Sequence, residues 1–78
     1  MELTNKRLFT NSIIKIHKEK KCKQKDMLDY PNLDYKNFKK VIITIECNKK
    51  IKKIEKIFEK QKWEDIKEEG FFITNTIL

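Results

Sequence analysis

FKKVIITIECNKKIKKIEKIFEKQK, which spans residues 38–62, is the stretch that decides the predicted fold. Its first ten residues are rich in β-branched side chains, which favour a strand over 38–47. Val41, Ile43 and Ile45 fall on one face of that strand, and the opposite face is mixed. We therefore expect a helix against the fully apolar face and partial cover on the other.

The residues after this strand predict a helix and then a second strand. Asn48 is a favourable helix N-cap, and isoleucine recurs at helical spacing behind it, so we expect a helix over 49–62. Gly70 precedes a second apolar stretch, which predicts a strand over 71–78. Residues 38–78 thus predict a strand–helix–strand unit with a small sheet, and the predicted fold class is α+β.

The N-terminal segment is expected to pack on this sheet, either as a helix or as a β segment. A helix over 4–23 would place Leu8, Ile13 and Ile16 on one face. The β-branched isoleucines would suit a strand equally well. Residues 63–69 could add another short strand, because their apolar side chains need cover.

Length and composition predict a single small domain over residues 1–78. Apolar residues make up 38% of the chain and charged residues 40%, and with one glycine there is no Gly-rich phosphate loop. The net charge of +7 favours polyanionic partners. Of the 19 basic residues, all but Arg7 are lysine, a pattern that an AT-rich genome also produces without selection for binding.

Lysines dominate one side of the helix predicted over 49–62. Like-charge pairs four residues apart on a helix cost about 0.2–0.5 kcal/mol each, which favours a function for the lysines as an electrostatic binding surface. The alternative is a solubilising face without a binding role. A second lysine group lies within residues 15–25, and two tyrosines of the predicted loop over 26–37 could stack on bases or fold back onto the domain. The candidate binding residues are Lys49, Lys52, Lys53, Lys56, Lys60, Lys18, Lys20, Lys21, Lys23, Tyr30 and Tyr35.

Catalytic chemistry has little support in the sequence, and we predict neither enzyme activity nor a cofactor or metal site. His17 and Ser12 occur without a motif that links them to an acid. Cys47 could be an activated thiol at the start of the predicted helix, but its place in the strand favours core packing. The acidic residues over 64–69 could meet lysines of a second copy or bind a divalent cation, and solvated carboxylates are the favoured interpretation.

The cytoplasm is the predicted location, or the host cytoplasm if the protein is phage-encoded. The N-terminus lacks the apolar stretch of a signal peptide. The longest apolar run, 41–45, is far shorter than the roughly 20 residues that a bilayer crossing needs. Cys22 and Cys47 should then be free thiols, and they lack the paired spacing of a zinc site.

The charge pattern predicts a non-enzymatic binding protein that engages nucleic acid or a ribonucleoprotein through lysine-rich helix faces. A homodimer through an open sheet edge is also expected. An acidic protein surface is the other partner that the lysines could bind. One alternative function is a small protein-binding inhibitor or adaptor that acts by occlusion, such as a phage-encoded blocker of a host defence complex. Trp63, Tyr30 and Tyr35 would then supply its main contacts. A further alternative is a metal-dependent nuclease that uses Glu46 and the acidic residues over 64–69.

Overall fold

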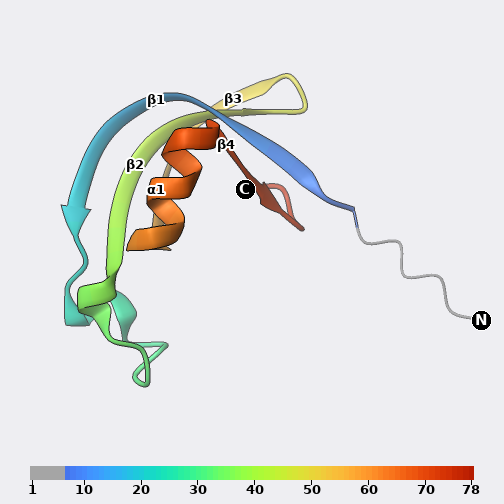
Figure 1. The fold of residues 1–78 in the computed structure, drawn as a ribbon. Helices are drawn as coiled ribbons and strands as arrows, with labels where there is room; N and C mark the ends of the chain where they lie inside the picture. The colour runs from blue at the N-terminus through green and yellow to red at the C-terminus, as the bar shows by residue number, and fades with distance from the viewer. Residues whose placement is uncertain (1–6) are drawn as a thin grey trace, which may run out of the picture.

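A computed structural model describes residues 7–78, which form a four-stranded antiparallel sheet curled around one helix (Figure 1). The strand order across the sheet is β3-β2-β1-β4. Two 3₁₀ helices lie in the connection between β1 and β2. The elements in chain order are β1 (Phe9–Lys21), the 3₁₀ helices Gln24–Met27 and Tyr35–Asn37, β2 (Phe38–Cys47), β3 (Lys50–Glu59), α1 (Lys60–Glu69) and β4 (Phe71–Thr74).

The helix predicted over 49–62 is wrong, because a β-hairpin occupies most of these residues. The strand predicted over 38–47 is confirmed as β2, and β3 pairs with it antiparallel in an unbroken register. Asn48 and Lys49 form the connecting turn with φ angles of 52° and 66°. Two successive positive φ angles are the mark of a type I′ hairpin turn. Asn48 therefore starts a hairpin and caps no helix.

The apolar spacing in this segment fits a helix and a strand alike. Ile54 and Phe58 lie four residues apart, which places them on one face in either conformation. In β3 both side chains reach the core, where Phe58 is 8% exposed and Ile54 packs against the buried cluster. Pairing with β2 also satisfies the backbone groups on one side of each strand. Pairing with β2 therefore determines the conformation of this segment, because its apolar spacing fits a helix and a strand equally well.

The α-helix begins at Lys60, close to where the sequence predicted a helix to end. Trp63 and Ile66 lie three residues apart on its inward face, and both are buried. Gly70 ends the helix with φ of 87°, and its N–H donates to the Ile66 carbonyl at 2.7 Å. A left-handed glycine at this position is a common helix C-cap. The short strand predicted over 63–69 is therefore wrong.

The strand–helix–strand unit predicted over 38–78 is wrong, and so is the α+β class built on it. The order is strand, strand, helix, strand, and every strand pair is antiparallel. β4 occupies only 71–74 of the strand predicted over 71–78, and it pairs with β1. The helix predicted over 4–23 is also wrong, since β1 lies in the sheet as a strand; the part of it before residue 7 lies outside the described residues.

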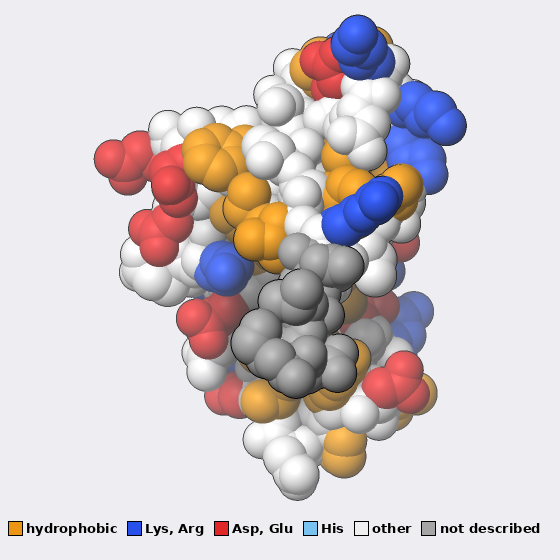
Figure 2. All heavy atoms as spheres, turned by 90° about the vertical axis from the view of Figure 1, so that its right-hand side faces the viewer, with side chains coloured by type: hydrophobic (Ala, Val, Ile, Leu, Met, Phe, Trp, Pro, Cys, Tyr) orange, Lys and Arg blue, Asp and Glu red, His pale blue; other side chains and the backbone are white. Residues whose placement is uncertain are grey.

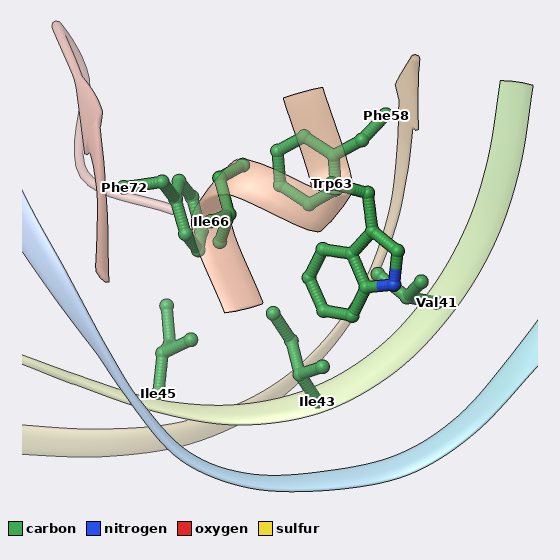
Figure 3. Close-up of a cluster of buried hydrophobic side chains, with 7 residues drawn as sticks. All are labelled: Val41, Ile43, Ile45, Phe58, Trp63, Ile66 and Phe72. Atoms are coloured by element: carbon green, nitrogen blue, oxygen red, sulfur yellow. The ribbon is translucent and has the colours of Figure 1, made fainter. Parts of the chain in front are cut away.

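The core lies between the concave face of the sheet and α1 (Figure 3). In Figure 3, Ile43 and Ile45 of β2 lie below Trp63 and Ile66, and Val41 lies to the right of the Trp63 indole. The Phe72 ring lies beside Ile66, and the Phe58 ring lies above the Trp63 indole. The Phe58 ring stacks on Trp63 with centroids 5.5 Å apart and meets Phe72 edge-on at 5.1 Å. The buried cluster is Val41, Ile43, Ile45, Phe58, Trp63, Ile66 and Phe72.

Irregular pairing bends β1 around this core. The register with β2 shifts between Ile13 and Lys15 and again between Ile16 and Lys18. Such bulges bend a strand and increase its twist, and β1 is visibly curved in Figure 1. In the part of the chain that the structure describes, no helix has both the length and the apolar character of a membrane crossing.

Candidate nucleic-acid interface

The lysines predicted to share one helix face lie on different parts of the structure. Lys49 is in the hairpin turn and Lys60 begins α1. Alternation along β3 places Lys52 and Lys56 on the concave face and Lys53 on the convex face. The predicted continuous lysine surface is therefore wrong, because it depended on a helix. The binding role of each of these five residues stays a prediction.

The second lysine group is gathered around one open hollow of about 500 Å³ at the end of β1, called here the lysine hollow. All four lysines predicted from this segment line it. Two further lysines and one acid complete the lining. The residues of the lysine hollow are Lys18, Lys20, Lys21, Lys23, Lys25, Lys40 and Asp26.

Asp26, the one acid of the lysine hollow, is already engaged. Its Oδ2 accepts from the Lys23 backbone N–H at 2.9 Å, and its Oδ1 accepts from Lys40 Nζ at 3.1 Å. The bond from the Lys23 backbone, followed by that from Lys40, lowers the pKa of Asp26 below its usual value. The bond to Asp26 in turn raises the pKa of Lys40. This pair is thus held in its charged form and neutralises itself.

The other five lysines of the hollow form no ion pair with any residue in the range 7–78. Across the sheet, Lys20 lies opposite Lys40 and Lys21 lies opposite Lys39. Like charges directly opposite each other destabilise a sheet. Lys39 and Lys40 are themselves paired with Glu19 and Asp26, so the charge left without a partner in the described structure belongs to the five lysines, and a bound polyanion would neutralise it. The five are Lys18, Lys20, Lys21, Lys23 and Lys25.

A second hollow of about 270 Å³, called here the tyrosine hollow, lies in the connection between β1 and β2. Residues of the 3₁₀ helix Gln24–Met27 line both this hollow and the lysine hollow. Tyr30 and Tyr35, the two predicted stacking residues, both line the tyrosine hollow, and Tyr30 is 60% exposed. Single-strand binders combine aromatic faces with a cationic track in this way. The two predicted tyrosines thus line one hollow and the lysines of 18–23 another, and the 3₁₀ helix Gln24–Met27 contributes different residues to each.

Trp63, His17 and Cys47, which the sequence analysis also considered, lie in places that do not favour the roles considered for them. Trp63 is fully buried, so it cannot be the partner contact that the inhibitor alternative assigned to it. His17 is exposed and shares a 2.6 Å hydrogen bond with Thr44 Oγ1, and desolvation followed by the charge of Lys53 lowers its pKa. Cys47 is half-buried and precedes a hairpin turn, so no helix N-terminus activates its thiol.

The acidic residues over 64–69 lie on the exposed side of α1. Figure 2 shows several acidic side chains on the left of the view and basic side chains at its top and upper right. Glu64 pairs with Lys67 at 2.9 Å. Among the described residues, no three His, Cys, Asp or Glu side chains come together as a metal site, so Glu46 does not join these acids in one.

Sequence reasoning missed Lys40 and Asn11. Lys40 reaches the lysine hollow from β2, and no local pattern connects it with the end of β1. Asn11 is fully buried and ties β1 to β4, since its Nδ2 donates to the Phe72 carbonyl at 3.2 Å and to Thr74 Oγ1 at 3.0 Å. A polar residue in a β-branched stretch was the only available signal.

No protein-family model, curated protein or solved structure matched this chain.

Proposed function

We propose that this protein binds nucleic acid, free or within a ribonucleoprotein, through the lysine hollow. One observation carries the proposal: five lysines without ion-pair partners in the described structure surround a hollow whose single acid is already engaged. Backbone phosphates would supply the missing negative charge, and binding would release condensed counterions. Lysine ammonium groups act as point charges and do not read base edges bidentately, so we expect weak sequence preference.

The tyrosine hollow favours a single strand as the ligand. Bases can stack on Tyr30 and Tyr35 only when they are unpaired, and such stacking is worth about 1–3 kcal/mol per base. We expect a strand bound along the lysines to continue past the 3₁₀ helix Gln24–Met27, which contributes residues to both hollows, and to reach the tyrosines. A cytoplasmic location, where both free thiols would stay reduced, belongs to the same proposal.

The test is a titration of labelled single-stranded and duplex RNA and DNA at several salt concentrations. The hollow variant is Lys18/Lys20/Lys23→Gln, and its matched control is Lys15/Lys50/Lys62→Gln, which removes the same charge from exposed lysines outside both hollows. We expect the hollow variant to reduce the slope of log affinity against log salt by about 2 on a single strand, because each phosphate contact contributes about 0.7.

The control variant should keep a slope close to that of the unchanged protein. Equal losses in the two variants would show that only net charge matters, and the lysine hollow would then not be the site. Absence of binding at low salt to every nucleic acid would contradict the function itself.

One observation favours a second candidate function, that of a protein-binding inhibitor or adaptor. Phe71 and Ile73 of β4 are 37% and 48% exposed and share the convex face of the sheet. Exposed neighbouring apolar side chains are a common feature of protein-binding surfaces. Binding to a protein that is insensitive to salt and lost in Phe71→Ser would favour this function over nucleic-acid binding.

A further inference from the structure

β3 forms one edge of the sheet, and its outer side has no backbone partner in the described structure (Figure 1). The two-residue turn makes Cys47 and Lys50 the hydrogen-bonded closing pair of the hairpin. Bonded and non-bonded pairs alternate along an antiparallel ladder from there. The odd-numbered residues of β3 therefore direct their N–H and C=O groups outward, free to pair with another strand.

The convex side chains of this edge are self-complementary when the strand is reversed. They follow the order Ile51, Lys53, Glu55, Ile57. If a second β3 runs antiparallel with Ile54 on the twofold axis, Lys53 lies opposite Glu55 of the second copy. Ile51 then lies opposite Ile57 of the second copy, and the symmetry repeats both pairs. The same alignment brings the outward backbone groups of both strands into register.

We infer that two copies of this chain pair β3 with β3 about Ile54, joining two four-stranded sheets into one. Several side chains are open to such pairing. Ile51 is 66% exposed, and the Glu55 side chain is 49% exposed, with Lys40 Nζ at 3.8 Å as its ion-pair contact. Pairing would cover Ile51 with an isoleucine and give Lys53 a carboxylate partner.

The charges on the convex face favour the Ile54 register over its neighbours. An axis at 52, 53, 55 or 56 would place Lys52, Lys53, Glu55 or Lys56 opposite its own copy. Like charges directly opposite each other across a strand pair are destabilising. Within residues 52–56, Ile54 is the uncharged position. The register with Ile54 on the axis therefore places no like-charge pair on the axis.

Lysines on an edge strand usually oppose pairing, and two of them lie on the concave face of β3. In the Ile54 register Lys52 would lie opposite Lys56 of the second copy. Each of these lysines has a contact within its own chain: Lys52 Nζ donates to the Leu78 carbonyl, and Lys56 Nζ lies 5.6 Å from the centre of the Phe58 ring. The two ammonium groups are thereby drawn toward their own chains.

The experiment is sedimentation equilibrium of the full chain from micromolar to millimolar concentration. The unchanged protein should approach twice its 9.5 kDa mass. Lys53→Glu and Glu55→Lys should each remain monomeric, because each places like charges across the axis. These two substitutions change net charge in opposite directions, so a shared loss cannot come from net charge.

Two combinations should restore the dimer. The double variant Lys53→Glu/Glu55→Lys re-forms the opposite-charge pairs, and an equimolar mixture of the two single variants forms them between different chains. Recovery in the mixture also shows that both single variants fold. A monomeric unchanged protein at millimolar concentration, single variants that dimerise normally, or no recovery in either combination would overturn the inference. None of these substitutions replaces a lining residue of the lysine hollow, and Lys53 forms no ion pair with any of them in the described structure, whereas Glu55 pairs with Lys40 of the hollow at 3.8 Å. Sedimentation is measured without nucleic acid, so its outcome does not depend on whether the hollow binds one.

Discussion

At the scale of single residues, one carboxylate joins the sheet to the helix. Trp63 Nε1 is buried with its ring and donates to Glu19 Oε1 at 2.9 Å, and Lys67 and Lys39 lie within 3.6 Å of the same oxygen. The hydrogen bond from Trp63 comes first among the causes that lower the pKa of Glu19 below its ordinary value of 4.5. Glu19 therefore stabilises the fold mainly as a carboxylate.

This depressed pKa gives the stability a definite pH dependence. Below 4.5 the unfolded chain takes up a proton at Glu19 before the folded chain does, so this contribution is full above 4.5 and is lost as pH falls through the folded pKa. We expect Glu19→Gln to be less stable than the unchanged protein near neutral pH, and the difference to shrink at about pH 3. Urea unfolding at both pH values measures it. A difference that stays constant with pH would show that the carboxylate charge has no role.

At the scale of elements, the hairpin turn holds a lysine in an unfavourable conformation. Lys49 has φ of 66°, and side chains other than glycine lose about 1–2 kcal/mol in the left-handed region. An Asn-Gly pair is the preferred sequence for this turn. We therefore expect Lys49→Gly to stabilise the fold by about 1 kcal/mol, part of the strain relief being offset by the flexibility of unfolded glycine.

Lys50→Gly is the matched control for this substitution. It removes the same charge one residue later, where β3 begins without a positive φ. A glycine there weakens the strand, so its unfolding midpoint in urea should fall while that of Lys49→Gly rises. Similar midpoints for the two variants would contradict the assignment of a strained turn at Lys49.

Some of these elements could be predicted from the sequence, and the others show why local patterns are not sufficient. β2 was found with its bounds because its β-branched residues are nearly continuous. β3 was missed because Ile54 and Phe58 fit both periods, and the Asn48–Lys49 turn lacks the glycine that usually identifies it. A helix that ends at residue 62 leaves residues 63–69 outside it, so the sequence predicts a short strand for Trp63 and Ile66, which in the structure belong to α1.

At the scale of the whole molecule, the position of each lysine on the surface depends on the strand pairing as well as on its place in the sequence. The lysines within 18–25 are neighbours in the chain, so their grouping could be predicted. Lys40 joins them only because β2 pairs antiparallel with β1, and the tyrosine hollow forms only because the connection between these strands is folded. The lysines of β3, by contrast, are neighbours in the chain and yet lie on opposite faces of the sheet.

The most direct test of the proposed site is a map of backbone amide NMR shifts as a single-stranded oligonucleotide is added to the full chain. We expect the largest shifts within residues 18–25 and around Lys40, together with Tyr30 and Tyr35. The hairpin turn at 48–49 and the acidic side of α1 should move least. Shifts centred on the hairpin turn, or spread evenly over every exposed lysine, would contradict the assignment of the lysine hollow as the nucleic-acid site.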